Sequence, residues 1–380
     1  MSSTKQPPQA PADAQGRRVR LADVAKRAGV SQTAASFVLT GRREEMRISL
    51  EVEARVLEAA RETGYRPNII SRSLRTGTTH TIGFISDTIA TTRFAGDLIR
   101  GALEAARDRG HLLLIAETEG DSQLEQQLLE TMADRQVDGI VLASMYTRKL
   151  KVPTSLRTGR AVLLNAVPER HAPLISVIPD ELEAGRTAAR TLLEAGYSKG
   201  IYLIGAGPRP TQRPKPTGAL AALERLQGIK ETLGAASVRV GGAVACQEWE
   251  PEVGYTAVRG LIARGAALQA LICFNDRLAV GAYNALQDAG LSVPDDVSVV
   301  SFDDDPIASW VTPQLTTVAL PHYELGRRSI EVLLNGVYGP ESSHVLGSEG
   351  NTVVRLPMPL RRRASVRMPP DPVNRYRGSG

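Results

Sequence analysis

The sequence predicts two doubly wound parallel-sheet α/β lobes, preceded by a small all-α headpiece with a helix-turn-helix. From residue 81 onward, short β-branched runs alternate with amphipathic helical segments, as in parallel βαβ units. These runs are about ten in number, more than one small doubly wound sheet holds, so two similar lobes with a cleft between them are expected. Residues 19–64 instead carry three short helical patterns and no strand pattern.

Length and composition agree with several folded domains. At 380 residues, the chain exceeds the size at which a single hydrophobic core keeps growing. Hydrophobic residues at 42% and charged residues at 23% argue against wholesale disorder. No apolar run approaches the roughly 18 residues of a membrane span, and residues 1–20 lack the apolar core of a secretion signal. We therefore expect a cytoplasmic protein with no membrane partner.

Charge is distributed unevenly along the chain. Residues 1–79 carry 14 Lys and Arg against 8 Asp and Glu, and residues 355–380 carry 7 against 1. The total of 46 against 41 leaves 25 against 32 for residues 80–354. A basic small domain attached to an acidic larger one is expected where only the small domain meets phosphate groups.

Residues 19–64 form the predicted headpiece. The first helix ends at Gly29, which can adopt the left-handed conformation of a helix C-terminus, and Ser31 is a favourable N-cap for the second. A third amphipathic helix follows and ends before Gly64. The order of helix, tight glycine turn and helix is that of a helix-turn-helix.

The segments outside these folded regions are predicted to be less regular. Residues 1–18 are rich in Pro, Gln, Ala and Ser and form a disordered arm, and the basic residues 361–380 form a disordered tail. Residues 65–79 form a hinge helix and linker, which is too short to be stable alone and folds only against a partner. The tail has no heptad repeat, which favours a dimer over a higher oligomer.

Residues 80–360 form the predicted two-lobed domain. The expected strands are 81–86, 111–117, 139–143, 161–165, 174–178, 200–204, 238–243, 270–274 and 297–302. The expected helices between them are 95–109, 122–135, 185–195, 220–233, 251–264 and 277–289.

Several motifs occur in an order that is informative as a set. They are VRLADVAKRAGVS at 19–31, ASFVL at 35–39, GYRPN at 64–68, SLR at 73–75, NDR at 275–277, VPDDVSVV at 293–300, FDD at 302–304 and LTTV at 315–318. Together they resemble the LacI family of transcriptional regulators over roughly residues 19–365. The resemblance implies a periplasmic-binding-protein-like effector-binding and dimerisation domain behind a DNA-binding headpiece.

The resemblance also implies the function. We expect a sequence-specific DNA-binding regulator, usually a repressor, that binds a palindromic operator in double-stranded DNA as a homodimer. A small effector, sugar-like in most of the family, would change the angle between the lobes and so the spacing of the two hinges. Such allostery typically couples the sites by about 1 to 3 kcal/mol.

Two other classes of protein compete with this interpretation. A sugar-binding protein of transport shares the two-lobed fold but would carry neither the helix-turn-helix nor the hinge. A nucleotide-dependent enzyme is suggested only by Gly205 and Gly207, a fragment that lacks the third glycine of a dinucleotide-binding loop. The histidines have no metal-ligand spacing, and Cys246 and Cys273 form no metal or redox motif. We therefore expect no enzyme, no catalytic residue, no metal and no cofactor.

The predicted DNA-binding residues follow from the helix-turn-helix and the hinge. The resemblance places base-reading side chains at Gln32, Thr33 and Phe37; Gln can bind adenine in a bidentate manner, whereas Phe offers only apolar contact to a thymine methyl. The alternative for Phe37 is packing in the headpiece core, and the family commonly has a polar or basic residue there. Leu74 matches the residue that wedges into the central base step. The full predicted set is Arg20, Ser31, Gln32, Thr33, Phe37, Asn68, Arg72, Leu74 and Arg75.

The predicted effector-binding residues lie in the two-lobed domain. The resemblance assigns ligand roles to Arg225, Asp303, Trp249 and Asn275; the first two suit paired hydroxyls, and Trp249 suits the C–H face of a sugar. Strand ends of the first lobe add Asp87, Phe94 and Asn165, for which capping or packing competes equally. We expect Asp276 to be a helix N-cap, and Asp304 and Asp305 to be solvated loop charges.

Overall fold

The computed structural model describes residues 19–65, 77–88, 95–157, 160–205, 220–336, 343–346 and 351–367. The chain divides into two compact units, residues 1–79 and residues 80–380, and each is described by itself.

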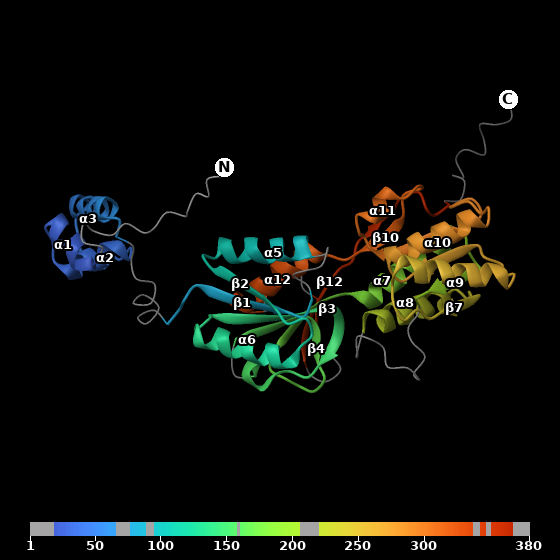
Figure 1. Ribbon diagram of the computed structural model, residues 1–380, viewed down its shortest axis with the longest axis horizontal. Helices are drawn as coiled ribbons and strands as arrows, with labels where there is room; N and C mark the ends of the chain where they lie inside the picture. The colour runs from blue at the N-terminus through green and yellow to red at the C-terminus, as the bar shows by residue number, and fades with distance from the viewer. Residues whose placement is uncertain are drawn as a thin grey trace, which may run out of the picture. The chain divides into compact units, whose positions relative to one another are not determined.

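The first unit contains a small helical headpiece (Figure 1). Its elements are α1 (Leu21–Ala28), α2 (Gln32–Leu39), a short 3-10 helix (Glu44–Met46) and α3 (Leu50–Thr63). The Ser31 hydroxyl accepts a hydrogen bond from the Ala34 amide at 3.1 Å, which caps α2 as predicted. Gly29 follows α1 in the left-handed conformation, as the tight turn requires. The three helices enclose a core of small apolar residues, Val24, Ala25, Ala28, Ala35, Val38, Val56, Ala59 and Ala60.

The first lobe of the second unit is built on a seven-stranded sheet in the order β11-β12-β5-β4-β3-β1-β2. The strands are β1 (Thr81–Ser86), β2 (Leu112–Glu117), β3 (Gly139–Leu150), β4 (Ala161–Pro168), β5 (Ile175–Pro179), β11 (Ser343–Leu346) and β12 (Thr352–Leu356). All neighbouring strands are parallel except β11 and β12. Helices α5 (Ala95–Asp108) and α12 (His322–Asn335) pack together on one face, and α6 (Ser122–Asp134) covers the other (Figure 1).

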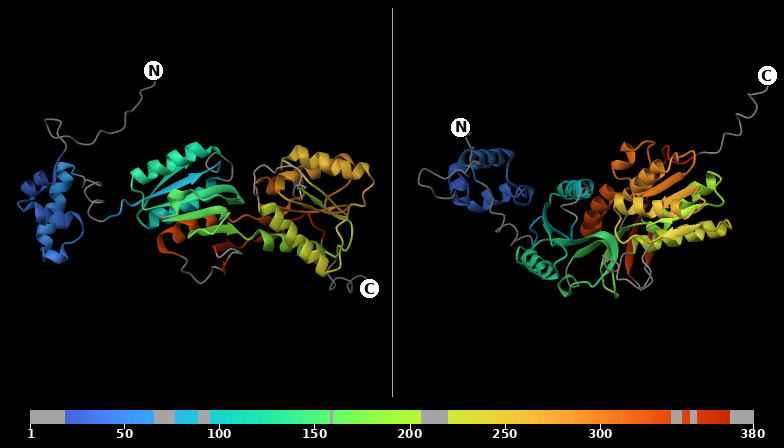
Figure 2. Two further views of the ribbon diagram at one scale, coloured as in Figure 1. Left: turned by 90° about the horizontal axis from the view of Figure 1, so that it is seen from below. Right: turned by 45° about the vertical axis from the view of Figure 1, so that its right-hand side comes forward.

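The second lobe has a six-stranded sheet in the order β13-β10-β9-β8-β6-β7. The strands are β6 (Ile201–Ile204), β7 (Gly242–Val244), β8 (Ala270–Cys273), β9 (Ser298–Asp303), β10 (Thr316–Ala319) and β13 (Leu360–Arg361). The helices are α7 (Glu181–Glu194), α8 (Ala221–Ala235), α9 (Pro251–Ala263), α10 (Asp276–Asp288) and the short α11 (Ile307–Trp310). The pair α7 and α8 and the pair α9 and α10 cover opposite faces, as right-handed crossovers require (Figure 2).

Three described segments pass from one lobe to the other. They lie between β5 and α7, between β10 and α12, and between β12 and β13. Because the last two return from the second lobe to the first and back, neither lobe is a continuous piece of chain. A bidentate ion pair beside the crossings joins Arg355 of β12 to Glu224 of α8, with both N to O distances at 2.8 Å. No helix of the described residues is both long and apolar enough to cross a membrane.

Most of the predicted elements are confirmed, and the differences have identifiable causes. The strand predicted at 238–243 is wrong, because β7 covers only Gly242–Val244. The prediction of a disordered tail from residue 361 is wrong for residues 361–367. There β13 pairs with β10, and the fully buried Ser365 hydroxyl donates to the Val299 carbonyl at 2.6 Å. These few residues close the edge of the second sheet.

Candidate DNA-binding and effector-binding sites

The N-terminal end of α2 presents polar side chains to solvent. Gln32 and Thr33 are exposed, whereas Ala35 and Val38 on the opposite side of the helix are buried in the headpiece core. Ser31 is exposed too, and its hydroxyl is used to cap the helix. An exposed helix end on a compact headpiece is the geometry that can enter a DNA major groove.

Phe37 lies one turn further along α2 and is only partly buried. It is outside the cluster of buried residues that forms the headpiece core, and the Arg42 guanidinium lies 5.2 Å from its ring centroid. The Arg42 side chain is exposed, so this cation–π contact places Phe37 at the surface of the headpiece. Arg20 is exposed at the start of α1, where its amide donates to Asp23 Oδ2 at 2.8 Å; its guanidinium has no acceptor and cannot cap the helix N-terminus. Asn68, Arg72, Leu74 and Arg75 lie outside the described residues.

Arg225 of α8 is the centre of a buried ionic network in the second lobe. Its Nε donates to Glu181 Oε2 at 2.6 Å and its Nη2 to Glu181 Oε1 at 3.1 Å, a bidentate pair. The same Nη2 donates to Asp303 Oδ1 at 3.0 Å, and Nη1 donates to the Phe274 carbonyl. Burial by itself lowers the pKa of Arg225, but the carboxylates of Glu181 and Asp303 outweigh it and hold that pKa above its usual value.

Close helix packing fixes the position of Arg225. A Cβ atom at Gly185 of α7 would lie 2.2 Å from the Arg225 carbonyl oxygen, and one at Gly228 of α8 would lie 2.1 Å from the Leu182 carbonyl oxygen. Only residues without a side chain allow α7 and α8 to approach this closely. The approach brings Glu181, in the first turn of α7, within reach of the Arg225 guanidinium.

Aromatic rings flank the same guanidinium. Its carbon lies 4.5 Å from the Phe302 ring centroid and 5.9 Å from that of Trp249. Trp249 makes an edge contact with Phe274. The Asn275 amide caps α10 by accepting from the Leu278 amide at 2.8 Å, and it donates to the Trp249 carbonyl at 3.1 Å. Arg225, Asp303, Trp249 and Asn275 therefore converge at the carboxyl ends of β8 and β9.

The first lobe contributes a second polar group at the ends of its strands. Asp87 follows β1; its Oδ1 accepts from the Met145 amide at 2.9 Å, and its Oδ2 lies 3.3 Å from Arg148 Nη2. Asn165 in β4 is buried and adopts a left-handed backbone with φ of +53°. Its amide oxygen has no hydrogen-bond partner among the described residues. Phe94 lies outside the residues that the structure describes.

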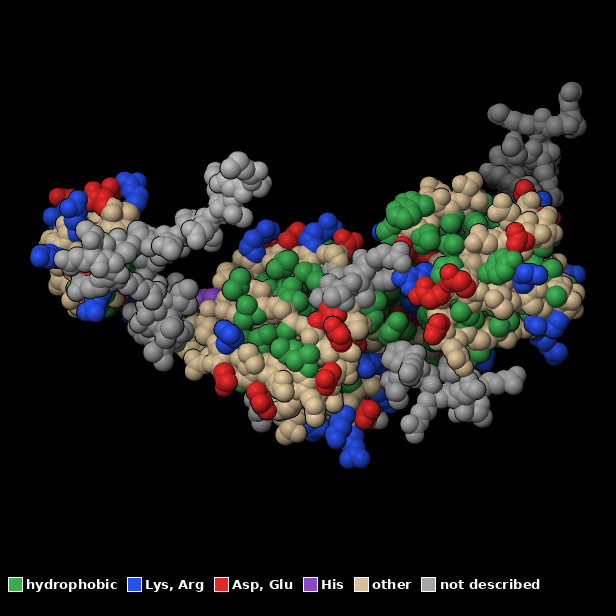
Figure 3. Space-filling model, viewed as in Figure 1, with side chains coloured by type: hydrophobic (Ala, Val, Ile, Leu, Met, Phe, Trp, Pro, Cys, Tyr) green, Lys and Arg blue, Asp and Glu red, His purple; other side chains and the backbone are tan. Residues whose placement is uncertain are grey.

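One side chain and one backbone hydrogen bond relate the two lobes at their junction. The hydroxyl of Tyr146 on β3 is influenced by charges of both lobes: partial burial raises its pKa, Arg277 lowers it, and Asp303 and Asp87 raise it again. The Leu220 amide at the start of α8 donates to the Thr147 carbonyl of β3 at 2.7 Å. Acidic and basic side chains gather where the lobes meet in Figure 3. No described cluster of His, Cys, Asp and Glu has the geometry to hold a metal ion.

Comparison with known proteins identifies the family. Residues 20–68 match the model of bacterial regulatory proteins of the lacI family, and residues 189–366 match that of the periplasmic binding protein-like domain. The chain is 32% identical over 322 residues to the ribose operon repressor of Escherichia coli (strain K12), an alignment that covers 84% of this chain and 93% of the relative. The chain belongs to the LacI family.

Other LacI-family proteins give the same assignment. The HTH-type transcriptional repressor PurR of Haemophilus influenzae (strain PittEE) is 32% identical over 317 residues, covering 83% of this chain and 90% of the relative. The lac repressor dimer bound to operator and the anti-inducer ONPF has the same fold, with a TM-score of 0.72 at 23% identity, covering 92% of this chain and 99% of that one. The protein is thus a DNA-binding transcription regulator with a two-lobed domain, and not an enzyme.

Three predictions made for acidic residues of this LacI-family site are wrong. Asn275, and not Asp276, caps α10. Asp276 is fully buried, where its carboxylate bonds to the Ser301 hydroxyl and accepts from the Asp305 amide at 2.8 Å. Burial, and then the charge of Asp303, raises the pKa of Asp276 to about 8. Asp305 is buried as well, and Asp304 Oδ1 accepts from Arg363 Nη2 at 2.6 Å, so neither is a solvated loop charge.

One residue of the site was missed by sequence reasoning. Glu181 follows the N-cap of α7, where an acidic residue is commonly explained by the helix dipole. The structure buries its carboxylate against Arg225. Only the pairing of α7 with α8 reveals this contact, so a one-dimensional pattern carried no signal for it.

Proposed function

We propose that this LacI-family protein is a repressor that binds a near-palindromic operator as a homodimer and is controlled by a small effector at the junction of its two lobes. The observation that carries the proposal is the exposed end of α2, with Gln32 and Thr33 free of the headpiece core. Because the operator would lie in the cytoplasm, we expect the protein to act there.

The DNA contact is assigned residue by residue. Gln32 and Thr33 would read base edges, and Arg20 would contact phosphate. Phe37 would contribute apolar contact to a thymine methyl, since it lies outside the headpiece core. The roles proposed for Asn68, Arg72, Leu74 and Arg75 rest on the LacI-family hinge motif alone.

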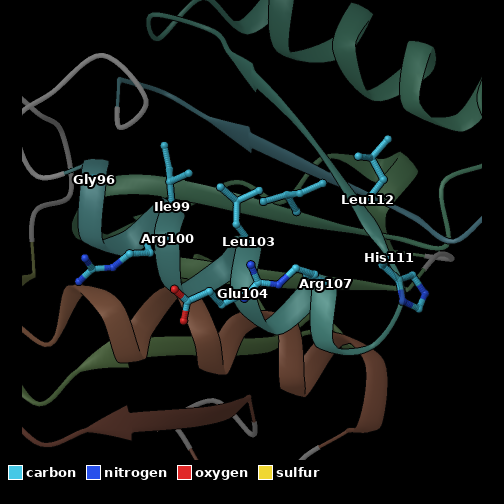
Figure 4. A pocket seen from close by; sticks show the side chains of 9 residues that line it. Gly96, Ile99, Arg100, Leu103, Glu104, Arg107, His111 and Leu112 are labelled. Carbon is cyan, nitrogen blue, oxygen red and sulfur yellow. The ribbon is translucent and has the colours of Figure 1, made fainter.

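A homodimer is supported by an exposed apolar face on the first lobe. Leu112 and Ile115 of the edge strand β2 are 62% and 39% exposed, and Leu103 of α5 is 44% exposed. Figure 4 shows Ile99, Leu103 and Leu112 on one side of the α5 ribbon, and Figure 3 shows the apolar surface that such side chains form. An uncovered apolar edge strand invites pairing or aggregation, and a second copy of this chain would cover it.

The second lobe adds one more large exposed side chain. Trp310 of α11 is 74% exposed. Aromatic residues of this kind are common anchors of protein interfaces, so we assign Trp310 to the same dimer.

The effector site would take its polar groups from both lobes. Asp303 and Trp249 would contact the ligand directly, while Arg225 and Asn275 hold them in place. Asp87 and Asn165 would contribute from the first lobe. The ribose operon repressor in Escherichia coli is a relative at 32% identity, which supports a sugar-like effector.

The proposed function is tested by fluorescence anisotropy of the full-length protein against its own upstream DNA at fixed salt. We expect site-selective binding that is weakened by Gln32→Ala, because a bidentate base contact is worth about 1 to 3 kcal/mol. The matched control is Gln126→Ala, the same change on the exposed face of α6. Equal binding to every duplex, or equal loss in both variants, would reduce the protein to a nonspecific DNA binder.

A further inference from the structure

The loop that follows α2 fixes an arginine to the end of this helix. The Gly41 amide donates to the Val38 carbonyl at 3.0 Å, and the Arg42 amide donates to the Phe37 carbonyl at 2.9 Å. This pair of hydrogen bonds is the Schellman motif, in which the side chain of the second loop residue commonly packs on the last turn of the helix. Here the Arg42 guanidinium does so, 5.2 Å from the Phe37 ring centroid.

Arg42 extends the exposed face of α2. Residues four apart share a helix face, so Phe37 lies on the same face as the exposed Thr33. Phe37 is outside the cluster of buried residues that forms the headpiece core. The Arg42 side chain, which is 44% exposed, continues this face beyond the last residue of the helix.

Glu45 holds the guanidinium by one edge. Arg42 Nε donates to Glu45 Oε1 at 2.7 Å, and Arg42 Nη2 donates to Glu45 Oε2, which makes the pair bidentate. The pair uses two of the five N–H groups of the arginine, and the other three lie outside it. An arginine whose plane is already fixed loses less conformational entropy when it binds than one that rotates freely.

The neighbouring Arg43 has a different role. Its Nε lies 3.2 Å from Glu53 Oε2 of α3, and its Nη2 lies 3.4 Å from Glu44 Oε1. Its side chain is 28% exposed, less than that of Arg42. Arg43 therefore ties the loop to α3, whereas Arg42 is held on α2.

The edge of a guanine suits the held Arg42 better than a phosphate group does. Guanine presents the acceptors N7 and O6 in the major groove, and their spacing matches the fork of an arginine in the commonest base-specific contact. Binding to phosphate depends instead on net positive charge. The ion pair of Arg42 with Glu45 has no net charge, but it fixes the direction in which the remaining N–H groups point.

From these contacts we propose that Arg42 reads a guanine in each half-site of the operator, and that Phe37 and Glu45 position it. The inference rests on the proposed function, because it adds a base contact to the same DNA-binding surface. Arg42 would supply the polar contact at the end of α2, where the Phe37 ring offers apolar contact to a base.

The test begins with enrichment of a randomised duplex library by the full-length protein. Fluorescence anisotropy then measures affinity for the enriched site and for duplexes in which each G·C pair is replaced in turn by A·T, in both half-sites together. The variants are Arg42→Ala, Arg42→Lys and Glu45→Ala. The matched control is Arg61→Ala, because Arg61 is exposed and pairs with Glu58 three residues away on α3, as Arg42 pairs with Glu45.

We expect one guanine in each half-site whose replacement weakens wild-type binding by about 5- to 150-fold per half-site, which corresponds to about 1 to 3 kcal/mol. Arg42→Ala should abolish this penalty and leave the penalties at other positions unchanged. Arg42→Lys should reduce the penalty while retaining affinity for unrelated duplexes, because lysine keeps the charge but not the fork.

Glu45→Ala separates positioning from charge. It should reduce the guanine preference, because the guanidinium loses the partner that fixes its plane. It should also strengthen binding to unrelated duplexes, because a negative charge is removed from the DNA-binding surface. Arg61→Ala should keep the sequence preferences of the wild type.

Three results would overturn the proposal. The first is an Arg42→Ala variant that binds all duplexes more weakly by one factor and whose salt dependence falls by about one unit of slope, which marks a phosphate contact. The second is an Arg42→Ala variant with the preferences of the wild type. The third is a Glu45→Ala variant with undiminished guanine preference. A wild type that enriches no sequence contradicts the proposed function too, whereas an enriched site whose preferences survive Arg42→Ala contradicts this inference alone.

Discussion

The contact between α7 and α8 offers a sharp test of how Arg225 is positioned. In Gly185→Ala, the new Cβ atom would lie 2.2 Å from the Arg225 carbonyl oxygen, about 1.2 Å short of the 3.4 Å at which ordinary van der Waals contact begins. The backbone of α8 cannot rotate away as a flexible side chain would, so the two helices must separate. Overpacking of this kind costs about 1 to 3 kcal/mol, even though alanine is a better helix former than glycine.

The matched control is Gly234→Ala on α8. A Cβ atom at Gly234 meets nothing within 4 Å, so only the change in helix propensity remains. Removing a glycine from a helix in this way stabilises a protein by about 0.4 to 1 kcal/mol. The two variants share the same chemistry and the same helix pair, and they are expected to shift stability in opposite directions.

The assay is urea unfolding of both variants, followed by titration of the effector. Gly185→Ala should lower the free energy of unfolding and weaken effector binding. Separation of the helices displaces Arg225, and Asp303 shifts as well because the two side chains are hydrogen-bonded at 3.0 Å. Gly234→Ala should raise the free energy of unfolding and leave effector binding unchanged. A Gly185→Ala variant as stable as Gly234→Ala, with full affinity, would refute the account of how the site is positioned.

Four further predictions concern other parts of the chain. Arg225→Met should destabilise the protein by about 3 to 5 kcal/mol in urea unfolding, because Glu181 is left buried without its cation, whereas a loss under about 1 kcal/mol would contradict the buried pair. The pKa of Asp276 is raised to about 8, so the folded state holds a proton that the unfolded state releases, and the stability of the wild type falls as pH rises toward about 8. Asp276→Asn should flatten this dependence of stability on pH between about pH 5 and 9. Parallel pH profiles for the variant and the wild type would refute the prediction. Ser31→Ala should cost about 1 kcal/mol of headpiece stability in thermal melting, since it removes the α2 cap. An unchanged melting temperature would mean that Ser31 does not stabilise the start of α2. Trp310→Ala should raise the dimer dissociation constant at least about tenfold in sedimentation equilibrium, while Gln126→Ala should not; equal values would exclude Trp310 from the dimer contact.

The sequence predicted those helices and strands that short runs of neighbouring residues determine. Gly29 ends the first headpiece helix and Ser31 caps the second, so each of these residues marks a helix boundary at its own position. The strand at 81–86 was predicted to the residue, because a buried parallel strand is a continuous apolar run between polar ends.

What the sequence could not supply depends on contacts between distant residues. Asn275 and Asp276 are both good N-cap residues, and only the burial of Asp276 against Ser301 decides between them. Residues 361–367 have the arginine content of a tail, yet two of those arginines lie beside Asp304 and the segment completes a sheet. The ion pair of Glu181 with Arg225 requires two helices to be packed before it exists.

Reciprocal linkage between operator and effector tests the central claim most directly. The dissociation constant of the effector is measured by calorimetry on the free protein and on the protein saturated with operator, and that of the operator is measured with and without effector. Thermodynamic linkage requires the two dissociation constants to change by the same factor. A coupling free energy of about 1 to 3 kcal/mol corresponds to a factor of about 5 to 150. An effector that binds with the same affinity whether or not operator is present would contradict the account.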